Sequence, residues 1–254
     1  MDLNFNNNLA VTLKSNSQIA RILTEDWVLR NSYCPSCGNE KLDQYSNNNP
    51  AADFYCVNCR SDFELKSSKN TLDNKVVDGA YDSMIKKIRS STNPNLFFLN
   101  YYVNYSVKTF FVIPKHFFIP EIIEKRKPLN PLARRAGWIG CNILVKNLPV
   151  SGRIFLVENE TITDRSQVLE QWEKTSFLKY EGLNSRGWLL ELISVVERIP
   201  NKTFNLSDVY SFENFFKTKF PKNQFVREKI RQQLQVLRDK GFIEFIGKGI
   251  YQKN

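Results

Sequence analysis

Four cysteines arranged as two CxxC pairs are the feature that most constrains how this chain can fold. Cys34 and Cys37 form the first pair, Cys56 and Cys59 form the second, and 18 residues lie between the pairs. That spacing is typical of a four-cysteine zinc site, because each pair can bend its own backbone so that two thiolates reach one ion. Four thiolates around a tetrahedral ion leave no open position for a substrate or a water molecule. The sequence therefore predicts a structural Zn²⁺.

A second set of reactive residues is interleaved with the cysteines, because Asp53, Glu64 and Lys66 have the spacing D-x(10)-E-x-K. Apolar residues alternate with polar ones from Asp62 to Lys66, so a strand here would place Glu64 and Lys66 on one face. Asp53 would then come from the adjoining strand. Carboxylates from two neighbouring strands can hold Mg²⁺, and a nearby lysine can neutralise a phosphate or orient the attacking water. A solvated strand face is the alternative explanation of the same spacing.

Net charge and histidine content restrict the classes of function. The chain of 254 residues has a net charge of +10, which indicates a polyanionic partner, with nucleic acid favoured over a membrane surface. Residues 217–254 carry ten Lys or Arg against three acidic residues, so most of the excess lies at the C-terminal end. The single histidine, His116, lies in an apolar run and is predicted to be structural. One imidazole also argues against two-histidine metal sites, HNH-type nucleases and Ser-His-Asp hydrolysis.

Cysteine usage and the lack of long apolar segments predict a soluble, cytoplasmic protein in a reducing compartment. The start of the sequence has no apolar signal segment. The most apolar run, from Leu96 to Pro114, is interrupted by polar residues and predicts two strands of a hairpin rather than a membrane span. The fifth cysteine, Cys141, is predicted to be a small buried apolar residue.

Alternating helix and strand patterns in the first part of the chain predict an α/β (α+β) domain with a mixed sheet. Apolar residues recur at helical spacing from Ser17 to about Arg30. A second stripe from Val77 to Ile88 predicts a helix whose acidic residues come early and basic residues late, as the helix dipole favours. Further predicted elements are strands at residues 96–103, 108–114 and 153–157 and a helix at about 166–174.

The segment from Lys125 to Asn142 combines clustered positive charge with an aromatic side chain. Arg134 and Arg135 precede Trp138, which lies between Gly137 and Gly140. A basic loop that presents an aromatic ring suits phosphate contact together with stacking or wedging at bases. A buried tryptophan at a turn, beside a solvated basic face, is the alternative.

Residues 183–254 predict a winged helix-turn-helix domain, with a linker at about Gly182 to Gly187. After a first helix, the pattern predicts a second helix capped by Ser207, a third from about Asn223 to Lys240, and two short strands around the turn 247–249. A winged helix that docks a protein is the alternative to one that binds DNA. The third helix and the turn present side chains suited to phosphates and purine edges, namely Arg227, Lys229, Arg231, Gln232 and Lys248.

Four stretches of the chain carry a resemblance to a known family, namely the Cys34 to Lys66 arrangement, 134–142 (RRAGWIGCN), 185–188 (SRGW) and 228–240 (EKIRQQLQVLRDK). They resemble the DpnI-like methyl-directed restriction endonucleases of the PD-(D/E)XK superfamily, and the similarity runs nearly end to end. The resemblance implies a PD-(D/E)XK catalytic domain with an inserted structural zinc site over residues 1–182, followed by a winged-helix DNA-binding domain over 183–254. It also implies Mg²⁺-dependent hydrolysis of both strands of double-stranded DNA at GATC sites that carry N6-methyladenine.

The same resemblance assigns roles by position. Asp53 and Glu64 would hold Mg²⁺, and Lys66 would assist the attacking water. Trp138 would belong to the loop that senses the methyl groups. The chain departs from the strict motif, because Ala52 stands where a proline often precedes the aspartate. A monomer without an obligatory protein partner is expected.

The rival hypothesis from another class is a DNA-binding regulator with a zinc ribbon and a winged helix but no catalysis. Composition does not distinguish the two hypotheses, since each needs a basic chain and four cysteines. The spacing of Asp53, Glu64 and Lys66 favours the nuclease.

Overall fold

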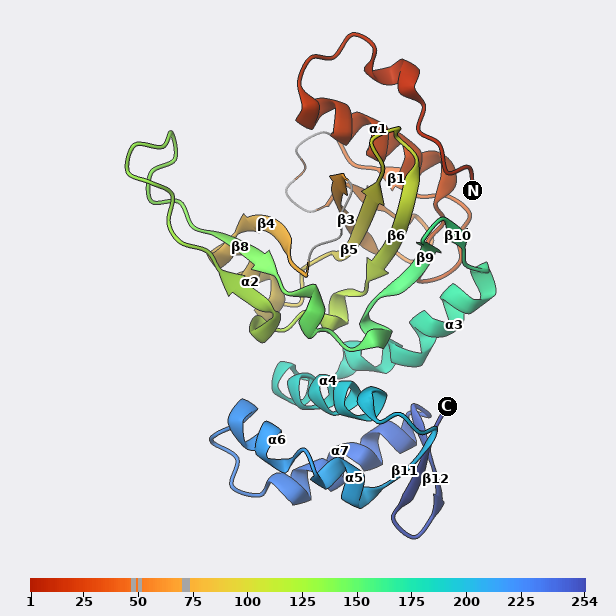
Figure 1. The fold of residues 1–254 in the computed structure, drawn as a ribbon, viewed down its shortest axis with the longest axis vertical. Helices are drawn as coiled ribbons and strands as arrows, with labels where there is room; N and C mark the ends of the chain where they lie inside the picture. Colours follow the sequence, from red (N-terminus) through yellow and green to blue (C-terminus); the bar gives the residue numbers. More distant parts are fainter. Residues whose placement is uncertain (47–48, 50–51, 70–73) are drawn as a thin grey trace. The chain divides into compact units, whose positions relative to one another are not determined.

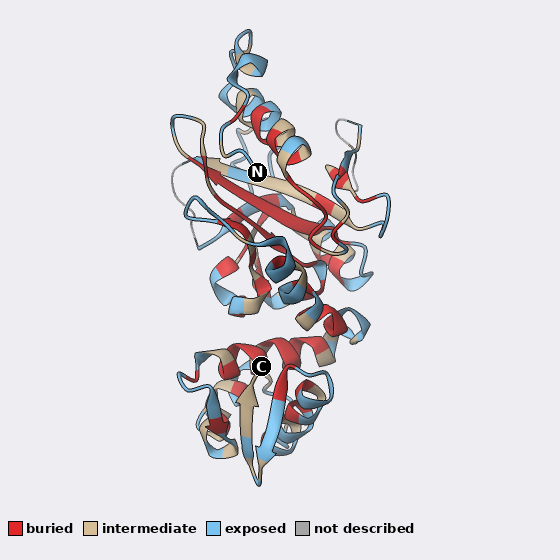
Figure 2. Ribbon diagram, turned by 90° about the vertical axis from the view of Figure 1, so that its right-hand side faces the viewer, coloured by how far each residue is buried: buried red, intermediate tan, exposed pale blue. Residues whose placement is uncertain are grey.

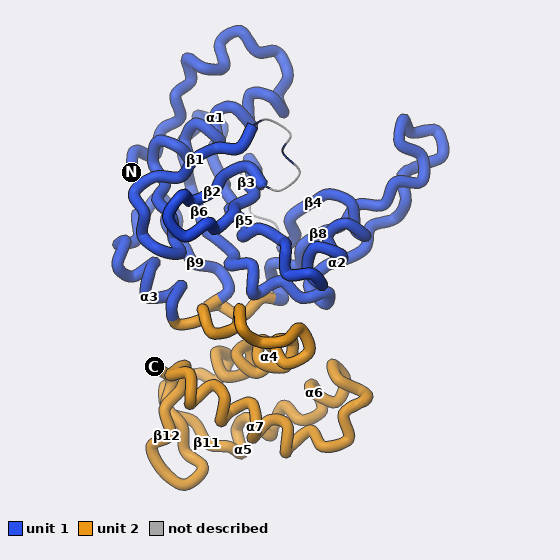
Figure 3. The backbone as a smooth tube through the Cα atoms, turned by 180° about the vertical axis from the view of Figure 1, so that it is seen from behind, with its two compact units in different colours: residues 1–147, 152–173 blue, residues 148–151, 174–254 orange. Residues whose placement is uncertain are grey.

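The chain forms two compact units. The computed structural model describes residues 1–46, 49, 52–69 and 74–254. Unit 1 consists of residues 1–147 and 152–173, and unit 2 consists of residues 148–151 and 174–254 (Figure 3). The domain boundary predicted between residues 182 and 183 stays a prediction.

Unit 1 is built on a mixed sheet, as predicted. Among the described residues, seven strands pair in the order β1-β2-β3-β5-β6-β9-β10 (Figure 1). β3 and β5 run parallel, and the other neighbouring strands run antiparallel. The strands are β1 (Asp43–Gln44), β2 (Phe54–Tyr55), β3 (Asp62–Lys69), β5 (Asn95–Tyr101), β6 (Val107–Ile113), β9 (Ile154–Glu158) and β10 (Thr161–Ile162).

The core of unit 1 lies between this sheet and helix α1 (Asn16–Asn31). The hairpin predicted from the most apolar run is confirmed as β5 and β6, which are almost entirely buried (Figure 2). Trp27 of α1 is fully buried and meets Phe110 edge to face, with ring centroids 5.2 Å apart. Phe63 of β3 stacks on Phe97 of β5 at 4.5 Å. Aromatic packing therefore holds α1 against the sheet and supports the pairing of β3 with β5, and this positions the residues of the site.

The region after residue 74 corrects one prediction from the sequence. The stripe from Val77 does not begin a helix, because Val76–Ala80 forms β4 and the helix α2 covers only Tyr81–Arg89. Adjacent β-branched valines followed by Gly79 disfavour a helix and suit a strand. Within the described residues β4 joins a three-stranded sheet, in the order β4-β8-β7, with β8 (Gly140–Ile143) and β7 (Ile123–Lys125).

Unit 2 contains a helix-turn-helix followed by a two-stranded wing. Its long helix α4 (Leu183–Arg198) packs on α7 (Val226–Asp239), and among the described residues three strands pair in the order β11-β13-β12. The predicted third helix and the two C-terminal strands are therefore present. The remaining elements of the unit are α5 (Leu206–Tyr210), α6 (Glu213–Lys219), β11 (Thr203–Asn205), β12 (Ile243–Gly247) and β13 (Ile250–Lys253).

Three local predictions for this part of the chain are wrong. The linker predicted at Gly182 to Gly187 lies largely inside α4, where Gly182 is the N-cap. The predicted second helix is broken into α5 and α6, and Asn205 rather than Ser207 caps α5, through a reciprocal capping box with Asp208. Strand β11 was not expected, because its pattern is short and its partner β13 lies far along the sequence.

The remaining helices are short, apart from α3 (Arg165–Ser176), which corresponds to the helix predicted at about 166–174. In the described residues no helix is long and apolar enough to cross a membrane. Single turns of 3-10 helix occur at Asn7–Ala10, Lys115–Phe117, Pro120–Ile122, Val145–Asn147, Val150–Gly152 and Phe177–Tyr180.

Candidate active site and metal centre

The two cysteine pairs adopt the same backbone conformation. In the first knuckle the N–H of Gly38 donates to the carbonyl oxygen of Cys34 at 2.8 Å, and in the second the N–H of Arg60 donates to that of Cys56 at 2.8 Å. Gly38 and Arg60 both have positive φ, of 74° and 57°. Each pair is thus a closed turn that directs its two thiols to one side. The matching turns come directly from the CxxC spacing.

The four thiols converge as the sequence predicts. Their Sγ atoms all lie within 4.8 Å of one another, and the Sγ atoms of Cys34 and Cys59, like those of Cys37 and Cys56, are 3.6 Å apart. Four sulfurs at about 2.3 Å from a tetrahedral Zn²⁺ would be separated by about 3.8 Å. The Asn58 amide also donates to the Cys37 sulfur at 3.5 Å, a contact that favours a thiolate ligand. The cluster could therefore hold a structural zinc ion.

The second knuckle is the turn that joins β2 to β3, so the cluster and the candidate catalytic residues share one hairpin. Phe54 and Tyr55 of β2 pair with Phe63 and Asp62 of β3. Asp53 extends this pairing, because its N–H donates to the Phe63 carbonyl oxygen at 3.0 Å. Its carboxylate accepts the N–H of Leu65 at 2.7 Å. The Asp53 side chain is thereby fixed beside the strand that carries the other two residues.

Glu64 and Lys66 lie on one face of β3, as the alternating pattern predicts. The Lys66 ammonium lies 2.6 Å from Glu64 Oε1 and 2.9 Å from Oδ1 of Asp78, a residue of β4. Burial opposes the charge on Lys66, but the two carboxylates outweigh it and raise the pKa of the ammonium above its usual range. Lys66 is therefore a cation at neutral pH.

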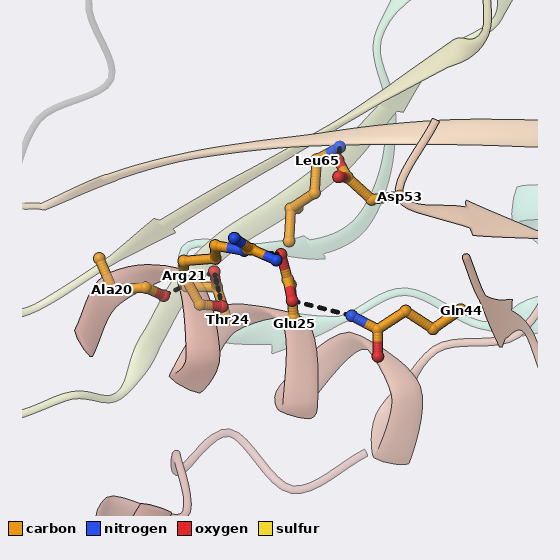
Figure 4. A network of polar contacts seen from close by, with 7 residues as sticks. All are labelled: Ala20, Arg21, Thr24, Glu25, Gln44, Asp53 and Leu65. Atoms are coloured by element: carbon orange, nitrogen blue, oxygen red, sulfur yellow. Dashed lines mark hydrogen bonds and ion pairs between the residues drawn. The ribbon is translucent and has the colours of Figure 1, made fainter. Parts of the chain in front are cut away.

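Helix α1 contributes a polar face to the same site (Figure 4). Arg21 Nε donates to Glu25 Oε1 at 2.8 Å, and Gln44 Nε2 donates to the other oxygen of Glu25 at 2.8 Å. Figure 4 shows Arg21 and Glu25 projecting from α1 towards Asp53 and Leu65. Sequence reasoning missed these residues, although an arginine and a glutamate four positions apart, opposite the apolar stripe, could have indicated a polar helix face.

A pocket of about 450 Å³ lies between α1 and β3. It brings together the three residues of the D-x(10)-E-x-K pattern and the polar face of α1. Its lining residues are Ser17, Ala20, Arg21, Thr24, Glu25, Asp53, Glu64, Leu65, Lys66 and Ser67.

The carboxylates of this pocket fit a hard divalent cation. Burial, the charge of Asp78 and the charge of Asp53 raise the pKa of Glu64, although Lys66 opposes the effect. A cation at Asp53 and Glu64 would remove part of that repulsion. Carboxylate oxygens are the ligands that Mg²⁺ prefers in proteins, so these two residues could hold it.

His116 lies elsewhere in unit 1. Its side chain is buried, its ring lies 5.1 Å from that of Phe117, and it meets Trp172 edge to face at 6.2 Å. It is not among the described residues that line the pocket. This environment agrees with the structural role predicted for the single histidine.

The basic segment predicted at residues 125–142 forms an arm between β7 and β8 that extends from the three-stranded sheet (Figure 1). Its two sides are joined by hydrogen bonds, including Leu129 N–H to the Trp138 carbonyl oxygen at 2.9 Å. Arg134 and Arg135 are exposed, and Trp138 is half-buried. The indole covers Gly140 so closely that a Cβ there would lie 2.9 Å from the ring. Trp138 is therefore held in place while keeping part of its surface open.

The predicted DNA-contact residues of unit 2 lie on α7 and the wing. Arg227 is exposed but paired, because its Nε lies 2.6 Å from Glu213 Oε2. Lys229 Nζ donates to Gln232 Oε1 at 2.8 Å. The Arg231 guanidinium lies 5.7 Å from the centre of the Tyr210 ring. Lys248 is exposed at the turn between β12 and β13. Their role in DNA contact stays a prediction, which rests on the residue types and on their places on α7 and the wing.

Comparison with known protein families covers nearly the whole chain. The sequence model of the Dam-replacing family, DpnI, matches residues 1–181, and that of the Dam-replacing HTH domain matches residues 184–253. The first match contains the cysteine cluster, the pocket and the arm. The second contains α4, α7 and the wing.

Proposed function

Because the chain belongs to the Dam-replacing (DpnI) family and is thus a methyl-dependent restriction endonuclease that acts on DNA, we propose that it hydrolyses both strands of double-stranded DNA at GATC sites carrying N6-methyladenine. In this proposal Mg²⁺ is the cofactor of the reaction, and the core of unit 1 is a PD-(D/E)XK nuclease core. Residues 1–182 form the catalytic domain and residues 183–254 a winged-helix domain that also binds DNA. The protein acts as a monomer.

The observation that carries the proposal is the convergence of Asp53, Glu64 and Lys66 on one pocket. Two carboxylates and an ammonium in this arrangement match the needs of phosphodiester hydrolysis, where negative charge accumulates on the phosphate. The hairpin that carries them is closed by the cysteine knuckle, so the same element could be stiffened by zinc.

In the proposed mechanism Asp53 and Glu64 hold the cation, and the protein's own groups position the reactants. Mg²⁺ would supply a lowered pKa for a bound water and charge stabilisation at the phosphate. The Lys66 ammonium, held at the edge of the pocket, orients the attacking water and neutralises the phosphate. Arg21, on the opposite wall, is suited to a neighbouring phosphate of the DNA backbone.

Two surfaces are proposed to read the DNA. On the arm, Arg134 and Arg135 contact phosphates while Trp138 covers the methyl group of adenine, which lies on the major-groove edge of the base. On unit 2, α7 enters the major groove and the wing contacts the backbone. The side chains assigned to this second surface are Arg227, Lys229, Arg231, Gln232 and Lys248.

A plasmid digest tests this function directly. Plasmids with fully methylated and with unmethylated GATC sites are incubated with the protein in Mg²⁺, in Ca²⁺ and in chelator. We expect fragments only from methylated plasmid in Mg²⁺, with ends that map to GATC. Binding without cleavage under every metal condition would instead support the non-catalytic regulator.

Variants then test the assigned residues. Alanine at Asp53, Glu64 or Lys66 should abolish cleavage, while each variant still binds methylated DNA in Ca²⁺. His116→Gln serves as the control, because the histidine lies outside the pocket and is replaced by a polar side chain. Full cleavage by Asp53→Ala would contradict the assignment, as would a folded His116→Gln variant without activity.

A further inference from the structure

Lys66 has a second anionic partner that the D-x(10)-E-x-K pattern does not contain. Asp78 comes from β4, and its Oδ1 atom lies 2.9 Å from the Lys66 ammonium. The same oxygen accepts the N–H of Gly79 at 2.7 Å. Glu64, the other partner, is also a proposed ligand of Mg²⁺. Lys66 is therefore held between one carboxylate that would face a cation and one that would not.

Burial separates the two carboxylates. The Asp78 side chain is 4% exposed, whereas those of Glu64 and Lys66 are 25% and 27% exposed. Asp78 is not among the described residues that line the pocket of about 450 Å³. It lines with Glu64 a small cavity of about 10 Å³, which is close to the space of a single water molecule. Asp78 is thus buried outside the open pocket to which Glu64 and Lys66 contribute.

A buried carboxylate of this kind is unfavourable unless it is paired. Among the described residues, the Oδ2 atom of Asp78 is buried without a hydrogen-bond partner. The ammonium of Lys66 is the one cation that forms an ion pair with Asp78 in the described part of the chain. Packing alone would be served better by an apolar side chain, so the pair points to a role in holding Lys66.

The sheet explains how Asp78 is aimed. Asp78 pairs with Cys141 of β8, and the register shifts between Asp78 and Ala80, so that Gly79 is the extra residue of an irregular ladder. Such irregularities change the direction of a side chain relative to a regular strand. The Cys141 thiol donates to the Gly79 carbonyl oxygen at 3.4 Å and supports this conformation.

We propose that Asp78 is a positioning residue that holds the ammonium of Lys66 at the edge of the pocket. The inference rests on the proposed function. When Glu64 turns its charge towards a divalent cation, Asp78 remains as the fixed anionic partner of Lys66. Asp78 itself touches neither the DNA nor the cation. Asp78 acts only through Lys66. Without Asp78 the Lys66 ammonium is no longer held at the reactive position.

The first experiment removes the charge of Asp78 and keeps the shape of its side chain. Asp78→Asn should lower the single-turnover cleavage rate at saturating methylated DNA about 10- to 100-fold, as expected when a catalytic group is displaced. Its Kd for the same DNA in Ca²⁺ should stay at the wild-type value, since Asp78 lies outside the pocket. Asp82→Asn is the matched control, because Asp82 is an exposed residue of α2 and its loss should change neither quantity.

The second experiment is a double-mutant cycle that measures thermal stability in the absence of DNA and Mg²⁺, so it does not depend on catalysis. Lys66→Gln leaves the Asp78 carboxylate buried and unpaired, so its Tm should fall by several degrees. Adding Asp78→Asn to Lys66→Gln should restore most of that loss. If Asp78 merely supported β4, the Tm decreases of the two single variants would add in the double variant.

Both experiments have to give the expected result for the inference to stand. Asp78→Asn that cuts at the wild-type rate, or Tm losses that simply add, would overturn the role of Asp78 while leaving the nuclease in place. A wild-type protein that cuts no DNA at all would overturn the proposed function instead, and the role of Asp78 in the reaction with it.

Discussion

Cys141 is, at the scale of a residue, the one cysteine that lies outside the four-cysteine cluster. As predicted, it is fully buried, on β8. Burial, together with the nearby negative charge of Asp78, raises the pKa of its thiol to about 12. Only the thiolate is a strong nucleophile, so this thiol is inert near neutral pH.

The corresponding prediction is that Cys141 resists alkylation in the folded protein. Native protein treated with iodoacetamide at pH 8 should show no label at Cys141 by peptide mass spectrometry, and full label after denaturation. Cys141→Ala supplies the control, because it should remove only the label that appears on denaturation. Labelling of the folded protein as fast as free cysteine would show that the thiol is accessible and ionised.

Trp138 carries the second prediction at this scale. Trp138→Ala should keep its fold but lose much of its preference for methylated GATC, because the indole no longer covers the methyl groups. Burying one methyl group is worth roughly 0.8 kcal/mol, so two give about a tenfold preference from burial alone. The ratio of cleavage rates on methylated and unmethylated duplexes measures the loss.

Gly140→Ala sharpens this test, because a Cβ at residue 140 would meet the Trp138 ring at 2.9 Å and displace it without removing it. Its rate ratio should also fall. A wild-type ratio and rate in Trp138→Ala would make Trp138 a packing residue, and the methyl group would then be read elsewhere, with α7 around Arg231 and Gln232 as the next candidate.

At the scale of elements, the β2–β3 hairpin joins the metal centre to the catalytic residues. The turn that contains Cys56 and Cys59 closes this hairpin. Asp53 directly precedes β2, and Lys66 lies on β3. The first cysteine pair begins at Cys34, shortly after the end of α1, so a metal bound by all four thiolates would link α1 to the hairpin. Zinc binding free energy would therefore appear as folding free energy of the wall that carries the site.

Removal of zinc should accordingly disorder the hairpin and abolish cleavage. Cys56→Ser should yield protein with less bound zinc by metal analysis, a lower Tm and no activity. Cys141→Ser is the matched control outside the cluster and should keep its zinc. Pure wild-type protein without zinc, together with a Cys56→Ser variant of normal Tm and activity, would show that the thiols have no structural metal.

At the scale of the whole molecule, positive charge is distributed unevenly. Residues 217–254 supply an excess of seven positive charges out of the net +10. These residues include α7 and the wing of unit 2. Because displaced counterions drive binding to duplex DNA, unit 2 should provide a large share of the affinity.

Residues 174–254 expressed alone should therefore bind duplex DNA, with log K falling steeply as log salt rises. Circular dichroism first establishes that the fragment is folded, and fluorescence anisotropy then measures its affinity over a range of salt. Arg231→Gln should reduce the slope by about one, as the loss of one phosphate contact would. A folded fragment that binds no DNA at low salt would favour a protein-docking role for the winged helix.

Much of this molecule follows from local spacing alone. The CxxC pairs determine two matching turns, and alternation along β3 places Glu64 and Lys66 on one face. The periodic apolar residues of α7 and the short apolar runs after it predict that helix and the two strands of the wing. In each case the residues belong to one segment, so the geometry of that segment is enough to bring them together.

Only the tertiary structure decided which segments meet. Asp53 reaches Leu65 because β2 pairs with β3, and Arg21 faces the same pocket because α1 packs on the sheet through Trp27. Asp78 meets Lys66 because Val76–Ala80 became a strand beside β8, although its apolar spacing suggested a helix. Pairing and packing between distant segments depend on the free energy of the whole core, and periodicity within one segment carries no information about it.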